Sequence, residues 1–326
     1  MLKSIAEVNQ KIAEGKFLLL AGSEEVLSQL SRGNWIGGTI PYFMDDNGGV
    51  CCESKVFVTE LPECASFAGL KEYTLETLPS LCNDAPENGV TYLIIPAGSA
   101  VHSAYAADAP GYENFLARPV VGWISGVHLS KLGEQKPKVF NGVTGQSFSD
   151  EALAMHVSLP SDKLAVLDII NVFQPGAGDT ITFPSRGFTA GDCEINGKPA
   201  NFAEYMTRTG QDTQVPLTAS YNGSIINASI QSVDKSSGVV NLYAPVFPGV
   251  EYRFGAPVKD YLGALEAAVG PKRESAAFSC NCILNYLYAG LEGKKTGSIT
   301  GPITFGEIAH QLLNQTIVQL FIQDLS

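Results

Sequence analysis

Three short motifs near the C-terminus, Phe278-Ser279-Cys280, Gly306-Glu307-Ile308 and Asn314-Gln315-Thr316, decide the fold class. An apolar segment leads into the first motif, and apolar residues at helical spacing follow it. This stretch therefore predicts a short strand, a helix, a polar loop, a short helix and a last strand, with small or polar residues at each junction.

The segments between these motifs predict where a ligand could be held. Residues 276–279 are expected to form a strand that brings Cys280 to its end, where a helix over 283–291 begins. Backbone N–H groups at such a junction point outward and favour an anion or a carboxylate. Residues 305–314 are expected to begin a short helix, and residues 316–322 to form an internal strand.

The rest of the chain alternates short apolar runs with turn-rich stretches. Residues 90–96 and 120–124 are predicted to be central strands, with a helix over 97–108 between them, and Asn196-Gly197 is a strong signal for a tight turn. This mixture predicts an α+β fold with mixed β-sheets, flanking helices and two structurally coupled halves.

Composition limits the class of partner and the compartment. The 326 residues are 45% hydrophobic and 17% charged, which is typical of a globular protein, and the net charge of -12 disfavours nucleic acid and anionic membranes as partners. Seven cysteines are an odd count, which argues against a disulfide framework. No signal peptide is visible, so we expect a cytoplasmic protein.

The C-terminal motifs resemble those of the second half of the FIST family (F-box and intracellular signal transduction proteins). The matching residues are Ser279, Cys280, Gly306, Glu307, Ile308, Asn314 and Thr316. Residues 195–200 are similar to the joint between the two halves of that family, and residues 36–39, 121–122 and 139–142 resemble its first half more loosely.

This resemblance implies a FIST N-terminal-like domain over residues 1–200 and a FIST C-terminal-like domain over residues 201–326. It implies a sensory module that binds a small polar metabolite and passes its signal to a separate output protein. For the family, this metabolite is suspected to be an amino acid. Two positions depart from the family pattern, because Ile283 stands where an Arg is frequent and Leu313 where a His is frequent. The missing Arg removes one partner for a carboxylate or phosphate.

The residues expected to meet the ligand come from both ends of the chain. They are Cys280, Asn281, Glu307, Asn314, Trp35, Thr39 and Tyr42. Cys280 and the backbone after it would line the cleft, Glu307 and Asn314 would hold the loop or meet polar groups, and aromatic residues would supply an apolar wall. Packing of a tryptophan at a tight strand crossing is the alternative for Trp35.

Catalysis and metal or cofactor binding have weaker signals. Cys280 and His310 could form a nucleophile–base pair of a hydrolase or transferase, and a subunit of an assembly without a ligand is a third possibility. No zinc-type cysteine spacing is present, and Gly176-Ala177-Gly178 lacks the third glycine of a dinucleotide site, so we expect neither metal nor cofactor. His128 and His156 lie near apolar segments and are expected to be structural.

Overall fold

The computed structural model describes residues 1–221, 224–270 and 276–325, and these form two compact units. Unit 1 comprises residues 1–170, 269–312 and 317–326, and unit 2 comprises residues 171–268 and 313–316. The two units alternate along the chain, whereas the expected halves, 1–200 and 201–326, are consecutive. Several mixed sheets and few helices confirm the predicted α+β class.

Unit 1 contains three six-stranded sheets that follow one plan. At the middle of each sheet, two strands run parallel and are joined through one short helix. These segments are β2 (Leu18–Gly22), α2 (Glu24–Leu27) and β3 (Trp35–Thr39); β8 (Gly89–Pro96), α4 (Ala100–Asp108) and β9 (Val120–Ser125); and β23 (Phe278–Cys282), α7 (Ile283–Tyr288) and β24 (Gly301–Thr304).

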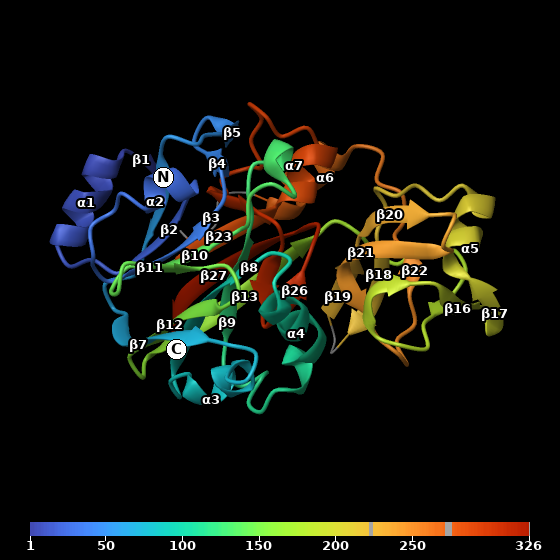
Figure 1. Cartoon of the computed structure of the whole chain (residues 1–326), viewed down its shortest axis with the longest axis horizontal. Coiled ribbons are helices and arrows are strands. Elements are labelled where there is room, and N and C mark those ends of the chain that lie inside the picture. Colours follow the sequence, from blue (N-terminus) through green and yellow to red (C-terminus); the bar gives the residue numbers. More distant parts are fainter. Residues whose placement is uncertain (222–223, 271–275, 326) are drawn as a thin grey trace. The chain divides into compact units, whose positions relative to one another are not determined.

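A return strand runs antiparallel beside the first strand of each central pair, and an outer strand lies next to the return strand. The return strands are β6 (Val56–Glu60), β12 (Ala152–Ser158) and β27 (Thr316–Asp324), and the outer strands are β1 (Leu2–Lys3), β7 (Ser66–Tyr73) and β13 (Lys163–Asn171). Helices α1 (Ile5–Ala13) and α3 (Leu81–Asp84) follow β1 and β7. Figure 1 shows the last strand, β27, in dark red, and it lies between β13 and β23 in the third sheet.

The three sheets are linked because each repeat contributes a pair of strands to the sheet of another repeat. These pairs are β4 (Tyr42–Asp45) with β5 (Gly48–Cys51), β10 (Val139–Asn141) with β11 (Gln146–Phe148), and β25 (Glu307–Ala309) with β26 (Gln311–Leu313). The first pair follows β3 but joins β24, the second follows β9 but joins β3, and the third follows β24 but joins β9. Unit 1 is therefore a threefold repeat with exchanged strand pairs.

The strand registers show which residues occupy equivalent positions in the three repeats. In the parallel pairs, the last residues of the second strands are Thr39, Ser125 and Thr304, which pair with Gly22, Pro96 and Cys282 respectively. All three hydroxyl groups belong to buried residues. A sequence repeat is not evident, because other equivalent positions carry different residue types.

The three sheets meet face to face at a buried centre. Trp123 on β9 stacks on Phe278 of β23, with ring centroids 5.8 Å apart. The backbone of β3 also approaches β9 closely, since a side-chain carbon at Gly38 would lie 2.9 Å from Trp123 Nε1. A glycine is needed at Gly38 for this approach.

Unit 2 contains three small sheets and two helices. Its strands are β14 (Ile181–Thr182), β15 (Gly187–Ala190), β16 (Asp192–Ile195), β17 (Lys198–Asn201), β18 (Leu217–Tyr221), β19 (Ser224–Ala228), β20 (Ile230–Asp234), β21 (Val239–Val246) and β22 (Arg253–Phe254), and its helices are α5 (Phe202–Thr209) and α6 (Tyr261–Val269). Its core includes Phe183, whose ring contacts those of Phe202 and Tyr252. The predicted turn at Asn196-Gly197 is confirmed, because it joins β16 to β17 with positive φ at both residues.

Other local predictions were confirmed or corrected by the structure. Strands β8 and β9 and helix α4 lie where 90–96, 120–124 and 97–108 predict them. The helix expected over 305–314 was wrong, because this segment forms β25 and β26 and pairs with β9 in the second sheet. Among the described helices, none is long and apolar enough to cross a membrane.

Candidate functional site

A small hollow opens where three strands of unit 1 end. Glu24 lies just beyond β2, Thr39 ends β3, and Gly126 and His128 follow β9; all four line the hollow. Its volume is about 20 Å³, enough for one water molecule. Ligands of α/β sheets bind beyond the carboxyl ends of parallel strands, and β2 and β3 are such a pair.

Charged groups of both signs surround this hollow, which we call the Thr39 hollow. Glu24 and Glu53 line it, and each carboxylate is held by a lysine outside the lining. Lys138 Nζ lies 2.5 Å from Glu24 Oε1, and Lys131 Nζ lies 2.7 Å from Glu53 Oε1. Lys136 adds an exposed ammonium group to the lining. The hollow therefore offers both carboxylates and a cation to a small polar molecule.

Thr39, one of the predicted ligand residues, forms the inner wall of the hollow. Its hydroxyl donates to the carbonyl of Lys138 at 3.3 Å and accepts from the N–H of Lys138 at 2.9 Å. Its own carbonyl accepts a hydrogen bond from Gly126 N at 2.7 Å. These bonds join the end of β3 to the start of β10 and to the end of β9, so Thr39 shapes the hollow mainly by holding its backbone.

The two aromatic residues of the expected apolar wall lie in different places. Trp35 packs in the hydrophobic core with Val8 and Ile12 of α1, and its Nε1–H donates to the carbonyl of Ser31 at 2.9 Å. Trp35 is therefore packed in the core, which is the alternative to a ligand-facing position considered for it above. Tyr42 stacks on His128, with ring centroids 5.7 Å apart, and is thus one layer behind the lining of the Thr39 hollow.

Cys280 and Glu307 face the centre of unit 1, where both are fully buried. The Cys280 thiol donates to the carbonyl of Gly122 at 3.5 Å. Burial, with the nearby Glu307 carboxylate as a smaller cause, raises the pKa of this thiol well above its usual value. A raised thiol pKa lowers the fraction of thiolate, which is the opposite of what a cysteine nucleophile needs.

The hydrogen bond described for the His310 ring is with a residue other than Cys280. Its Nδ1 lies 3.0 Å from the carbonyl oxygen of Phe115, and burial lowers the pKa of the imidazole. His310 has a φ of 59°, the left-handed conformation, at the junction of β25 and β26. The cysteine-dependent hydrolase or transferase therefore stays a prediction to which these contacts add no support.

We call the buried residues Cys280, Asn281, Glu307, Trp123 and Ser125 the polar centre of unit 1. A comparison of the three repeats shows that its carboxylate has no counterpart in the other two. Glu307 is the cross-strand partner of Trp123. The residues equivalent to Trp123 in the other two sheets are Gly37 and Pro302, and their cross-strand partners are Phe140 and Phe43 respectively. The third repeat thus has a carboxylate where the other two have phenylalanine. Burial of a carboxylate is costly, and breaks of the local packing rules are expected near functional sites.

The same divergence is visible on the first strand of the third repeat. Cys280 and Asn281 occupy the positions that Leu20 and Ala21 hold in the first repeat, and that 94–95 hold in the second. The side-chain oxygen Oδ1 of Asn281 accepts from Asn285 Nδ2 at 2.8 Å and from Cys282 N at 2.8 Å. Asn281 therefore holds the start of α7, and its own Nδ2 has no hydrogen-bond partner within the described residues.

The polar centre also contains two unused donors. Trp123 Nε1 and Ser125 Oγ have no hydrogen-bond partner among the described residues, although both side chains are buried. Ser125 directly precedes Gly126, which lines the Thr39 hollow. The hollow and the polar centre thus lie on consecutive residues of the same strand end.

Asn314, the remaining predicted ligand residue, belongs to unit 2. Its carbonyl oxygen Oδ1 accepts from Ser229 Oγ at 2.6 Å and from Ser229 N at 3.1 Å, while its backbone carbonyl accepts from Asn227 Nδ2 at 3.0 Å. These contacts make Asn314 part of a buried hydrogen-bond network in unit 2. The sequence motif that drew attention to Asn314 therefore coincides with a structural anchor of that unit.

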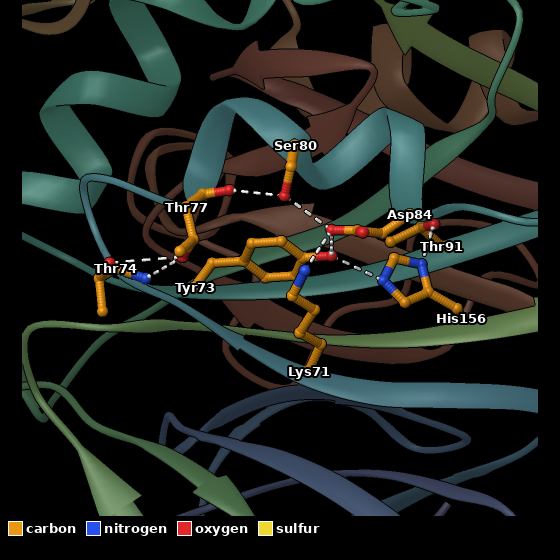
Figure 2. Close-up of polar contacts among 8 residues, drawn as sticks. All are labelled: Lys71, Tyr73, Thr74, Thr77, Ser80, Asp84, Thr91 and His156. Atoms are coloured by element: carbon orange, nitrogen blue, oxygen red, sulfur yellow. Dashed lines mark hydrogen bonds and ion pairs between the residues drawn. The ribbon is translucent and has the colours of Figure 1, made fainter.

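A second polar cluster was missed by the sequence analysis, and Figure 2 shows its members. Asp84 accepts hydrogen bonds from Tyr73 at 2.9 Å and Ser80 at 2.7 Å, and pairs with Lys71 at 2.6 Å. Tyr73 also lies 2.9 Å from His156 Nε2. We call this group the His156 cluster.

The hydrogen-bond directions in the His156 cluster follow from one donor. Because the Tyr73 hydroxyl donates to Asp84, its oxygen accepts from the Nε2–H of His156. His156 Nδ1 then accepts from the Thr91 hydroxyl at 2.8 Å. Burial lowers the pKa of His156 to about 4, which keeps the ring neutral at pH 7. No local motif could have indicated this cluster, since its members come from β7, the 3-10 helix η1 (Leu78–Ser80), α3, β8 and β12.

Comparison with known proteins identifies a family but not an activity. No curated protein and no solved structure gives a match. Residues 3–323 match a family described as a family of unknown function (DUF6976). The chain therefore belongs to the DUF6976 family.

Proposed function

We propose that this protein is a cytoplasmic sensory module that binds a small zwitterionic metabolite of the amino-acid class in the Thr39 hollow. The observation that carries this proposal is the position and charge of the hollow. It lies beyond the carboxyl ends of β2 and β3 and presents carboxylates and a lysine in one lining. A molecule with both an ammonium and an oxyanion group would match both signs.

The ammonium end of the ligand would be bound by Glu24 and Glu53. Their side chains are 45% and 47% exposed, so a ligand can reach them despite their lysine partners. Exposed ion pairs contribute little to stability, about 0–1 kcal/mol, and a ligand ammonium could exchange with the lysines at small cost. The hollow would have to widen, because its present volume suits one water molecule.

Such a widening would connect binding to a signal. The wall that must move contains Thr39 and Gly126, whose backbone hydrogen bond joins β3 to β9. Ser125, whose hydroxyl has no described hydrogen-bond partner, directly precedes Gly126. A ligand that binds the widened state more tightly would shift the population toward that state, which a separate output protein could recognise. The FIST resemblance of the C-terminal motifs supports the same class of function.

A thermal-shift screen against the twenty amino acids tests the proposal. A ligand at 100 times its dissociation constant adds about 2.7 kcal/mol to stability, which raises the melting temperature by several degrees. The double variant Glu24→Gln, Glu53→Gln should bind the hit at least tenfold more weakly, because charge-assisted contacts to the ammonium are lost. Glu194→Gln, an exposed carboxylate of unit 2, is the matched control and should bind normally.

Two results would contradict the proposal. If none of the twenty amino acids raises the melting temperature, the proposed ligand class is refuted. A hit whose affinity is the same for the wild type and for the double Glu24, Glu53 variant would place binding elsewhere in the chain.

A further inference from the structure

His128 is held from several sides in the lining of the Thr39 hollow. Its Nδ1 lies 2.7 Å from Ser130 Oγ and accepts a hydrogen bond from Ser130 N at 3.2 Å. Because the backbone N–H can only donate, Nδ1 acts as an acceptor and the neutral ring carries its proton on Nε2. No described hydrogen bond uses Nε2, so this N–H is free for another acceptor.

Tyr42 supports the ring of His128. The two rings stack with centroids 5.7 Å apart and an interplanar angle of 24°. Tyr42 is itself fixed, because its hydroxyl accepts from Leu129 N at 3.1 Å and its ring packs against Tyr286 with centroids 5.4 Å apart. The ring of His128 is therefore oriented before any ligand arrives, and such preorganisation lowers the entropic cost of binding.

We infer that His128 is a ligand-binding residue that donates its Nε2–H to an oxyanion group of the ligand, with Tyr42 as its positioning residue. This inference rests on the proposed function, and it assigns the second end of the zwitterion. The oxyanion would be a carboxylate or a phosphate, since both accept the same hydrogen bond. Sequence reasoning had placed His128 among structural histidines and Tyr42 at the ligand.

The lining also contains a lysine, Lys136, which is less suited to binding the oxyanion. Lys136 is exposed and carries a flexible side chain, whereas His128 is half-buried and held at Nδ1 and on one ring face. Ordering a lysine costs more side-chain entropy than using a ring that is already fixed. His128 should therefore dominate the oxyanion contact, and Lys136 should add a weaker contribution.

NMR of the histidine ring nitrogens in the full-length protein tests the inference with three separate probes. Acetate represents a carboxylate, inorganic phosphate represents a phosphate, and methylammonium represents the other end of the ligand. We expect acetate or phosphate to shift the Nε2 signal of His128 in a saturable way, and the stronger of the two identifies the oxyanion. Methylammonium should instead shift backbone signals near Glu24 and Glu53.

The outcomes separate this inference from the proposed function. If methylammonium binds at Glu24 and Glu53 while neither anion moves the His128 signal, the role of His128 is refuted and the hollow remains a binding site. If no probe binds at the hollow, both the inference and the proposed function fail.

Variants sharpen the assignment of roles. His128→Ala should weaken binding of the active anion at least tenfold and leave methylammonium binding unchanged, whereas His128→Gln, which keeps an N–H donor, should restore part of the loss. Tyr42→Leu should weaken the anion several-fold, and Tyr42→Phe, which keeps the stacked ring, should have a smaller effect. Equal loss of anion and methylammonium binding in Tyr42→Leu would mean that Tyr42 only maintains the fold, and would overturn its positioning role.

Discussion

Two histidines of unit 1 lie in charged surroundings, and they differ in what their neighbours leave unsatisfied. In the His156 cluster both ring nitrogens are hydrogen-bonded, and Tyr73 and Asp84 continue the chain of bonds to the surface. In the Thr39 hollow, His128 is bonded through Nδ1 alone. A closed network of this kind stabilises the fold, whereas an oriented donor beside a hollow is available to a ligand. A high density of polar contacts is therefore a poor guide to a binding site.

Replacing each histidine with alanine should give the largest difference in stability between the two sites. His156→Ala leaves the Thr91 hydroxyl without its partner, removes one of the two partners of the Tyr73 hydroxyl and opens a cavity, so we expect a loss of about 3 kcal/mol in the free energy of unfolding. His128→Ala, at a half-buried position, should cost less than about 1 kcal/mol. Urea unfolding at pH 7 measures both. Equal losses would mean that the two histidines serve the fold alike.

Acid should destabilise the protein through His156. Its pKa is about 4 in the folded state and near 6.5 in the unfolded state, so the unfolded state binds more protons between these values. Stability is fully present above about pH 6.5 and is lost as the pH falls toward 4. From pH 7 to pH 5 this one group should cost about 2 kcal/mol.

The variant His156→Gln isolates that contribution. It removes the titrating group, so the difference in unfolding free energy between pH 7 and pH 5 should shrink by about 2 kcal/mol relative to the wild type. Other groups titrate in both proteins and cancel in this difference. An unchanged pH dependence would show that the ring has the same pKa in the folded and unfolded states, against the burial and hydrogen bonding described above.

The sequence predicted the elements of unit 1 better than their arrangement. The strands β8 and β9 and the helix α4 were predictable, because each combines a local apolar pattern with clear turn residues. The segment after Phe305 was mistaken for a helix, because its strands are very short and depend on pairing with β9 for their conformation. The threefold repeat is not evident in the sequence, since most equivalent positions carry different residue types, such as Leu20, Ile94 and Cys280.

The sequence predicted only part of the candidate site. Among the predicted ligand residues, Thr39 lines the Thr39 hollow, whereas Cys280 and Glu307, which were found by motif, lie at the polar centre of unit 1. The contact of Tyr42 with His128 joins residues 86 positions apart, and the His156 cluster joins five elements. Such contacts depend on exchanged strands and sheet register, which a single sequence does not reveal.

Neutralising Lys71 should have the smallest effect and test how the His156 cluster is balanced. The Lys71 side chain is 42% exposed, so Lys71→Met should lower the free energy of unfolding by less than about 1 kcal/mol. Burial is the main cause that lowers the pKa of His156, the Asp84 carboxylate raises it, and the charge of Lys71 lowers it by a smaller amount, so removal of that charge should raise this pKa above about 4. NMR titration of the ring nitrogens measures the shift. Lys3→Met removes a half-buried lysine that pairs with Glu7, and should leave His156 unaffected. A fall in the pKa of His156 in Lys71→Met would mean that Asp84 changes its partner when Lys71 is lost, and that the cluster is less rigid than its hydrogen bonds suggest.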